Sequence, residues 1–153
     1  MTRQKITPFL WFDGKAEEAA EFYVSIFPDS AVTGVTPGPA GAALVVAFRL
    51  AGLDFVALNG GPQFTFNEAI SLSIDCHSQA EVDELWEKLS AGGSKGQCGW
   101  LKDKYGLSWQ VVPSVLPKLL ADADRAKAAR VMEAMMRMTR MDIQALQDAA
   151  DGK

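Results

Sequence analysis

The sequence has very few of the residues that build metal and disulfide sites. It contains one histidine, His77, and two cysteines, Cys76 and Cys98, among 153 residues. A single histidine cannot supply the two or three imidazoles of a typical catalytic zinc site. The cysteines form no C-x-x-C motif, which excludes a zinc ribbon and a thioredoxin-like site. We expect both thiols to be reduced, as is usual in the cytoplasm.

Long hydrophobic runs and an excess of positive charge are missing as well. No stretch approaches the roughly 20 apolar residues that cross a bilayer. The first apolar run, residues 6–12, is too short for a secretory signal. The net charge of −4 argues against nucleic acid or an anionic membrane as the main partner. Because 48% of the residues are hydrophobic, we expect a globular, cytoplasmic protein with a real core.

The pattern of apolar residues predicts the same order of elements twice. The first series is a strand, a helix and three strands, at residues 6–12, 15–27, 30–35, 42–50 and 53–58. The second is a strand, a helix and two short strands, at residues 69–74, 78–90, 97–101 and 107–112. Asp13 is the expected N-cap of the first helix, and Ser78 opens an S-x-x-E capping box on the second. The repetition indicates a duplicated supersecondary unit.

We divide the chain into residues 1–62, 63–113 and a helical tail, residues 114–153. Two tail helices are predicted at about 125–137 and 142–149. Five of the six methionines lie in this tail, at positions 132, 135, 136, 138 and 141. We expect Met132, Met135, Met136 and Leu146 to form a packing face, either in the core or at a subunit interface.

Several segments resemble one known family, the PhnB-like branch of the vicinal oxygen chelate superfamily. The superfamily includes glyoxalase I and the bleomycin-resistance proteins, and this branch is often labelled 3-demethylubiquinone 3-methyltransferase-like. The resemblance covers about residues 5–150, and the segments that carry it are Ile6–Phe12, Ala19–Tyr23, Ala57–Pro62, Phe66–Ser71 and Gly96–Pro113. It implies an α+β fold of two βαβββ modules whose curved sheets enclose a cleft, and it implies a homodimer.

Enzymes of this superfamily hold a divalent metal with His and Glu side chains on the first and last strands of each module. The equivalent positions here are Thr7 or Pro8, Ile70 or Ser71, Val56 and Gln110. None of them is His, Asp or Glu, whereas divalent metals prefer carboxylate, imidazole or thiolate ligands. The resemblance therefore predicts a protein without a metal or other cofactor. Glu68 lies one or two residues from a ligand position, so weak metal binding through Glu68 and Gln110 stays open as an alternative.

The methyltransferase label implies a glycine-rich loop between a strand and a helix N-terminus. The candidate segments do not have that setting. Gly60-Gly61-Pro62 precedes a loop, and Gly92-Gly93 follows a helix. Neither segment predicts a cofactor site.

Aromatic and polar residues near the predicted cleft are the candidate ligand contacts. They are Trp11, Asn59, Phe66, Asn67, Glu68, Cys98, Trp100 and Gln110. Gln110 is the strongest polar candidate, because an amide within an apolar strand needs a partner. Cys98, expected on a strand, is interpreted as a small buried residue, since no base is placed to form a thiolate. His77 and Asp103 are interpreted as a surface loop residue and a turn residue.

Three functions fit these observations. The first is a metal-free module that binds a small apolar or aromatic molecule in the cleft between the modules. The second is a divalent-metal-dependent enzyme of the lyase, isomerase or dioxygenase type. The third is a protein-interaction module that works through the Met-rich helices.

Overall fold

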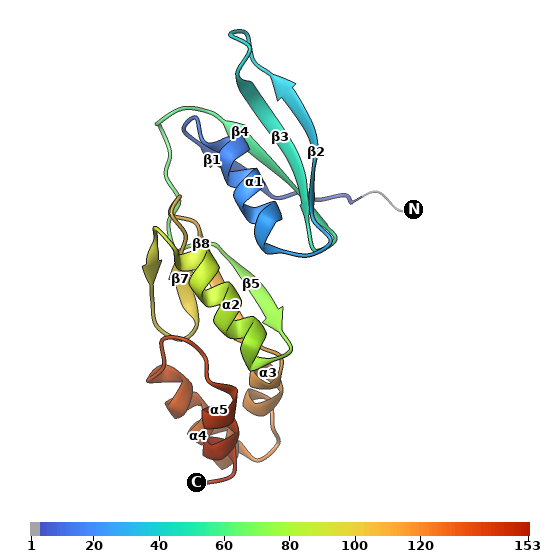
Figure 1. Cartoon of the computed structure of the whole chain (residues 1–153). Coiled ribbons are helices and arrows are strands. Elements are labelled where there is room, and N and C mark those ends of the chain that lie inside the picture. The colour runs from blue at the N-terminus through green and yellow to red at the C-terminus, as the bar shows by residue number, and fades with distance from the viewer. Residues whose placement is uncertain (1–3) are drawn as a thin grey trace. The chain divides into compact units, whose positions relative to one another are not determined.

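A strand, a helix and three further strands occur twice in the computed structural model, which describes residues 4–153. The chain forms two compact units that divide between Phe66 and Asn67. Each unit contains a four-stranded mixed sheet with a helix across one face (Figure 1). The sheet orders are β1-β4-β3-β2 and β5-β8-β7-β6, so the two βαβββ modules share one topology. The α+β prediction of two such modules is confirmed.

Unit 1 consists of one helix and one sheet. Its elements are β1 (Phe9–Phe12), α1 (Ala16–Ile26), β2 (Ala31–Pro37), β3 (Ala43–Leu50) and β4 (Leu53–Asn59). The first strand, β1, lies at the edge of the sheet and runs parallel to the last strand, β4, and alternate residues of both strands are buried. The buried face packs against α1, where the Tyr23 ring stacks on Phe48 at a centroid distance of 6.2 Å.

The start of α1 differs from the prediction. Its N-cap is Lys15, which makes no side-chain cap, so the predicted cap at Asp13 is wrong. The amide of Asn59, at the end of β4, fills this role instead. Its Oδ1 accepts a hydrogen bond from the Ala16 N–H at 2.9 Å, and its Nδ2 donates to the Ala43 carbonyl at 2.9 Å. A long-range contact therefore satisfies the helix N-terminus, and local sequence gives no sign of it.

Unit 2 repeats the arrangement and adds the tail. Its sheet and first helix are β5 (Ser71–Cys76), α2 (Gln79–Ser90), β6 (Ser94–Lys95), β7 (Trp100–Lys102) and β8 (Ser108–Pro113). The predicted capping box on α2 is confirmed, because the Ser78 Oγ accepts from the Glu81 N–H at 3.1 Å. The Glu81 carboxylate in turn accepts a hydrogen bond from the His77 N–H at 2.7 Å. In the usual capping box this donor is the N–H of the N-cap residue itself, here Ser78.

Three helices form the tail, α3 (Val115–Leu120), α4 (Arg125–Met136) and α5 (Ile143–Ala150). Its buried residues are Leu116, Ala128, Val131, Met141, Leu146 and Ala150. The predicted core packing is wrong for Met132 and Met136, which are 44% and 61% exposed. Ala128 and Val131 occupy the inner face of α4, so the methionine that follows Val131 turns outward. No helix among residues 4–153 is long and apolar enough to cross a membrane.

The connector between α4 and α5, residues 137–142, is bound to the rest of unit 2. The Met138 and Thr139 carbonyls accept hydrogen bonds from the Cys98 and Gly99 N–H groups, both at 2.8 Å. Met141 is completely buried. The tail is therefore part of the second unit's core.

Candidate functional site

The helix of each unit covers one face of its sheet and leaves the other face uncovered by that helix (Figure 1). We call the uncovered sides open face A, in unit 1, and open face B, in unit 2. Side chains alternate along a strand, so Val56 of β4 and Gln110 of β8 lie on the open faces. Both faces therefore contain positions that correspond to metal ligands in the superfamily.

Open face A is mainly apolar. Its central residues are Phe9, Trp11, Val45, Ala47, Val56 and Leu58. At one end lies a pocket of about 250 Å³ whose lining includes Thr7, Val56, Arg49 and Asp54. The structure thus brings the two ligand positions of unit 1 to one pocket. Val56 has no donor atom, and the Asp54 carboxylate is bound to the Arg49 guanidinium at 2.9 Å.

Trp11 is fixed by the loop that follows β4. Its Nε1 donates to the Gly61 carbonyl at 2.9 Å, and its ring meets Phe64 edge-on at a centroid distance of 4.9 Å. A Cβ at Gly60 would lie 2.3 Å from the indole ring, so only glycine fits there. The Gly60-Gly61 pair therefore accommodates Trp11. Phe66 packs edge-on against Phe12, at a centroid distance of 5.4 Å.

Open face B is polar by comparison. The Gln110 Nε2 donates to the Ser71 Oγ at 2.9 Å, which joins the two ligand positions of unit 2 in one hydrogen bond. The register pairs Gln110 with Trp100 on the neighbouring strand β7. Ser71 rather than Ile70 takes the first-strand position, because Ile70 precedes the strand and is 65% exposed. The prediction that Gln110 has a polar partner is confirmed.

A second pocket, of about 230 Å³, lies next to this pair on open face B. Its lining residues are Glu68, Ser94, Gly96, Trp100, Leu101, Lys102 and Ser108. The Lys102 ammonium forms an ion pair with the Glu68 carboxylate, and this contact lowers the pKa of Glu68. The Ser108 side chain is 1% exposed, and its Oγ has no hydrogen-bond partner among the described residues.

Asp103 holds the hairpin that carries this second pocket. It is 2% exposed, and its Oδ1 accepts from the Tyr105 and Leu107 N–H groups at 2.8 and 3.1 Å. Its Oδ2 accepts from the Trp109 Nε1 at 2.9 Å. The turn role predicted for Asp103 is confirmed, and the carboxylate also fixes a core tryptophan.

The remaining candidate residues have local roles. Asn67 is exposed, and its Oδ1 accepts from the Ala69 N–H at 2.9 Å, which is typical of an Asx turn. Cys98 lies in a turn with a φ of 58°, so the predicted strand begins at Trp100 and not at Gln97. Burial raises the pKa of the Cys76 thiol to about 12, which suppresses its nucleophilic form.

The donor groups present do not fit a divalent metal. Residues 4–153 contain no cluster of three or more His, Cys, Asp or Glu side chains. Near open face B the Glu68 carboxylate is held in an ion pair with Lys102, and the Gln110 amide donates to the Ser71 hydroxyl through its Nε2. An amide is also a weak substitute for the carboxylate or imidazole that such metals prefer.

Sequence reasoning did not select Lys102, Ser108 or Ser94. A usable signal was present, because Trp100 and Lys102 are two residues apart on one strand, as are Ser108 and Gln110 on the next. Period-two spacing places each pair on one face. Only the strand pairing, which sets Lys102 opposite Ser108, shows that the pairs are neighbours.

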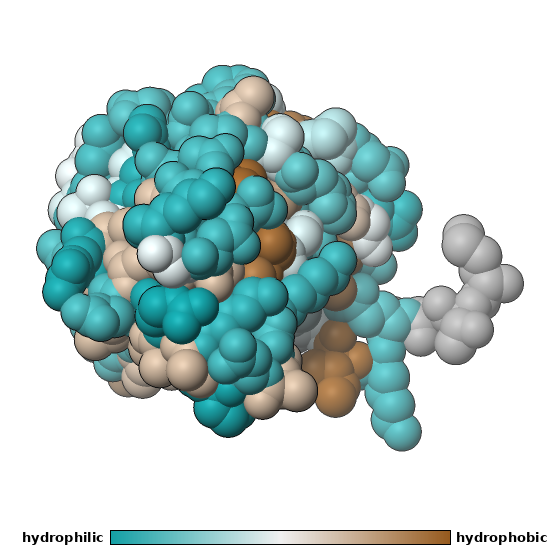
Figure 2. All heavy atoms as spheres, turned by 90° about the horizontal axis from the view of Figure 1, so that it is seen from below, coloured by the Kyte–Doolittle hydropathy of each residue, from teal (hydrophilic) through white to brown (hydrophobic). Residues whose placement is uncertain are grey.

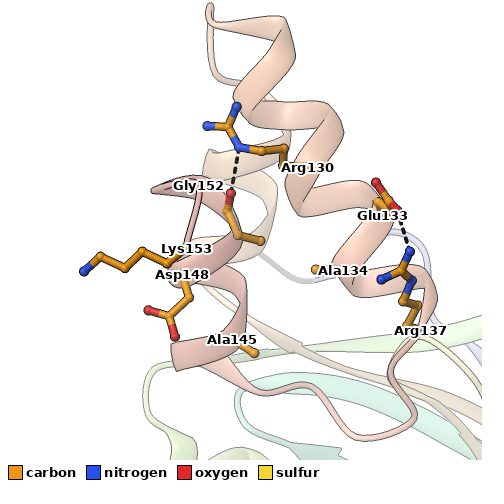
Figure 3. Close-up of a pocket in the computed structure, with 9 residues that line it drawn as sticks. Arg130, Glu133, Ala134, Arg137, Ala145, Asp148, Gly152 and Lys153 are labelled. Atoms are coloured by element: carbon orange, nitrogen blue, oxygen red, sulfur yellow. Dashed lines mark hydrogen bonds and ion pairs between the residues drawn. The ribbon is translucent and has the colours of Figure 1, made fainter.

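The tail contains a further pocket of about 450 Å³, between α4 and α5 (Figure 3). Both of its arginines already bind other groups within the tail. The Arg130 guanidinium donates to the Ala149 and Ala150 carbonyls at 2.9 and 2.7 Å, and Arg137 pairs with Glu133. Arg130 therefore stabilises the C-terminal end of α5.

Comparison with known families and structures agrees with this topology. A sequence model of the family described as 3-demethylubiquinone-9 3-methyltransferase matches residues 4–112. The PhnB protein of Bacillus cereus is 35% identical in sequence, and the alignment covers 72% of this chain and 99% of that one with a TM-score of 0.68. The family match ends at residue 112, so the tail lies outside it. No curated protein matches the chain.

More distant structures share the fold. The glyoxylase/bleomycin resistance protein/dioxygenase domain of Frankia sp. EAN1pec is 18% identical, over 73% of this chain and 93% of that one, with a TM-score of 0.53. The fosfomycin resistance protein FosX of Listeria monocytogenes, solved with Mn(II) and sulfate, is also 18% identical. That alignment covers 71% of this chain and 90% of FosX, again with a TM-score of 0.53.

Proposed function

This chain belongs to the 3-demethylubiquinone-9 3-methyltransferase (PhnB-like) family and has the vicinal oxygen chelate fold, and on that basis we propose that it binds a small apolar or aromatic molecule without a metal. Each open sheet face is a candidate binding surface. Trp11 supplies apolar surface on open face A, and Trp100 supplies it on open face B, where the polar groups near Trp100 orient the ligand. Small-molecule sites usually combine apolar walls with a few convergent polar groups.

One observation carries the proposal, namely the identity of the residues at the positions where superfamily enzymes have metal ligands. On open face A the last-strand position is Val56, which has no donor atom. On open face B it is Gln110, whose amide is hydrogen-bonded to the Ser71 hydroxyl at 2.9 Å. The faces therefore keep the fold's site positions but offer apolar and neutral polar groups there. Such groups suit an organic molecule and not a cation.

Methyl transfer from a nucleotide cofactor has little support in this chain. The Trp11 indole fills the space that a side chain at position 60 would occupy. Gly93 sits where a Cβ would lie 2.1 Å from the Lys102 carbonyl. Both glycines thus serve close packing within their own unit, and neither forms the start of a helix as a phosphate-binding loop does.

The metal-dependent alternative needs Glu68 and Gln110 to act together as ligands. Glu68 is engaged by Lys102 and Gln110 by Ser71. A metal would have to compete with Lys102 for the Glu68 carboxylate, and together with the Gln110 amide oxygen it would gain only two ligand groups. This set falls short of the ligand number that hard divalent cations require.

The interaction alternative rests on the Met-rich tail. Hydrophilic side chains cover most of the surface seen from the end where the tail lies, and strongly hydrophobic residues form only small spots there (Figure 2). Val131, Met141 and Leu146 are completely buried. These observations favour a structural role for most of the tail over a docking surface for a different protein.

We further propose that the protein is a cytoplasmic homodimer. Both cysteines are free thiols, as expected in a reducing compartment. Met132 and Met136 are exposed one turn apart on α4 and suit an interface. Light scattering that gives a concentration-independent mass of 16.5 kDa would contradict the dimer.

The binding function is tested by native mass spectrometry of freshly purified, untagged protein. We expect a co-purified organic molecule, lost on denaturation, in a preparation without stoichiometric metal. The variant Trp100→Ala should lose that adduct, whereas Leu53→Ala, at the 44% exposed first residue of β4, should keep it. A stoichiometric divalent ion in the parent protein would instead support the enzyme alternative.

A further inference from the structure

We propose that the 230 Å³ pocket of open face B binds a small aromatic carboxylate, with Lys102 and Ser108 holding the carboxylate and Trp100 contacting the ring. This inference deepens the proposed function, on which it rests, by naming the class of ligand. It is drawn from an unsatisfied buried hydroxyl, a cation with an exposed counter-ion and an apolar wall, all of which line one pocket.

The Ser108 hydroxyl is the first of these observations. Its side chain is 1% exposed, and its Oγ has no hydrogen-bond partner among residues 4–153. Buried polar groups in folded proteins are nearly always paired, and an unpaired one costs stability. Because Ser108 lines the pocket, a ligand oxygen that accepts its proton would remove this cost.

The second observation is the position of Lys102. The register places it directly opposite Ser108 on the neighbouring strand, so the ammonium and the hydroxyl border one space. The present partner of Lys102 is Glu68, which belongs to no strand or helix and whose side chain is 59% exposed. Exposed ion pairs contribute little stability, so another carboxylate can take the place of Glu68.

The apolar wall and the size of the pocket define the rest of the ligand. Trp100 and Leu101 line the pocket together with the backbone at Gly96, where a Cβ would lie 2.9 Å from the Trp100 carbonyl. A flat indole favours stacking with another ring. At about 230 Å³ the space is smaller than the roughly 300–1,000 Å³ that drug-sized ligands occupy. A single ring with one carboxylate group matches it.

The test is isothermal titration calorimetry on the full chain with three probes, benzoate, benzamide and acetate. Benzoate should bind with a dissociation constant of about 1 mM, as expected for a ligand of this size. Benzamide keeps the ring without the charge, and acetate keeps the charge without the ring. We expect each to bind about tenfold more weakly than benzoate, because each lacks one of the two contacts.

Four variants assign the contacts. Lys102→Met should weaken benzoate binding about tenfold or more, and Ser108→Ala about fivefold. Ser108→Ala should at the same time raise the melting temperature, because it removes an unpaired buried hydroxyl. Glu68→Gln should strengthen benzoate binding about threefold, because it removes a competing carboxylate. The matched control is Lys88→Met, which removes the Lys88–Glu84 ion pair on α2 and should leave binding unchanged.

Benzamide binding as tight as benzoate binding, or full benzoate affinity in Lys102→Met, would overturn the assignment of a carboxylate. Trp100-dependent binding of benzamide alone would leave the proposed binding function standing while this inference fails. If none of the probes binds and purified protein carries a stoichiometric metal, the proposed function fails as well.

Discussion

The two units of this protein share a strand order but differ in the chemistry of their open faces and in what stabilises them. Open face A is apolar around Val56, and the loop after β4 fixes its tryptophan through Gly60 and Gly61. Open face B carries the Gln110–Ser71 pair and an ion-paired lysine, and its hairpin depends on a buried aspartate and on the tail. Duplication of a fold therefore preserves site positions without preserving the groups that occupy them.

Removal of the tail should have the largest effect on stability, and this effect should differ between the two units. Deleting residues 122–153 removes the buried side chains of Val131, Met141 and Leu146 and leaves the Cys98 and Gly99 N–H groups unpaired. Because a large-to-small change at one such site costs about 2–5 kcal/mol, we expect unit 2 to unfold. Hydrogen exchange should show lost protection in residues 71–113 and retained protection in residues 9–59. Equal loss in both segments would contradict the assignment of the tail to unit 2.

The two hairpins offer a finer comparison. Asp103→Ala removes a buried carboxylate that accepts three hydrogen bonds and should cost about 3 kcal/mol in the free energy of unfolding. Asp54→Ala, in the corresponding hairpin of unit 1, breaks only a half-exposed pair with Arg49 and should cause little change. Urea unfolding of both variants checks this. Similar urea midpoints for the two variants would contradict the claim that the buried aspartate stabilises its hairpin more than the half-exposed one does.

A glycine substitution tests how Trp11 is held on open face A. Gly60→Ala would place a Cβ 2.3 Å from the indole and should destabilise unit 1 by about 1–3 kcal/mol through overpacking. Gly34→Ala in β2, where a Cβ would meet no atom within 4 Å, is the matched control and should be neutral. The two melting temperatures give the answer, and equal values would contradict the role of Gly60.

The smallest expected effect is a pH dependence confined to open face B. The hydrogen bond from Lys102 holds the pKa of Glu68 below its usual range in the folded state. A depressed carboxyl pKa stabilises the fold above the unfolded value, near pH 4.3, and this contribution is lost as the pH falls through the folded value. Glu68→Gln should therefore flatten the acid limb of the stability curve slightly. An identical acid limb in the parent and the variant would count against the ion pair.

Much of this fold could be predicted from the sequence, because it depends on local patterns. The capping box at Ser78, the buried stripes of the two helices and the duplicated series all follow from period and spacing. The family resemblance then implied the α+β fold of two βαβββ modules. The match to residues 4–112 agrees with that resemblance for the two modules.

The parts that could not be predicted depend on contacts distant in sequence. Asn59, the last residue of β4, caps α1 although it is 43 residues away in the sequence. The turn at Cys98 is set by hydrogen bonds with the connector near Met138. Likewise, Lys102 and Ser108 become a site only through strand pairing and the approach of Glu68. Gln110 was found because a polar residue in an apolar strand is visible in the sequence itself.

The most direct test of the central claim, that these sheet faces bind an organic molecule and not a metal, is the melting temperature of untagged protein with and without divalent cations. A ligand raises stability only if it binds the folded state. We predict no shift with Zn²⁺, Ni²⁺ or Mn²⁺ in the parent, and a shift in the double variant Ser71→His with Gln110→Glu. That variant restores two ligand types at positions whose side chains now lie 2.9 Å apart. A cation-dependent rise in the parent that disappears in Gln110→Ala would contradict the account.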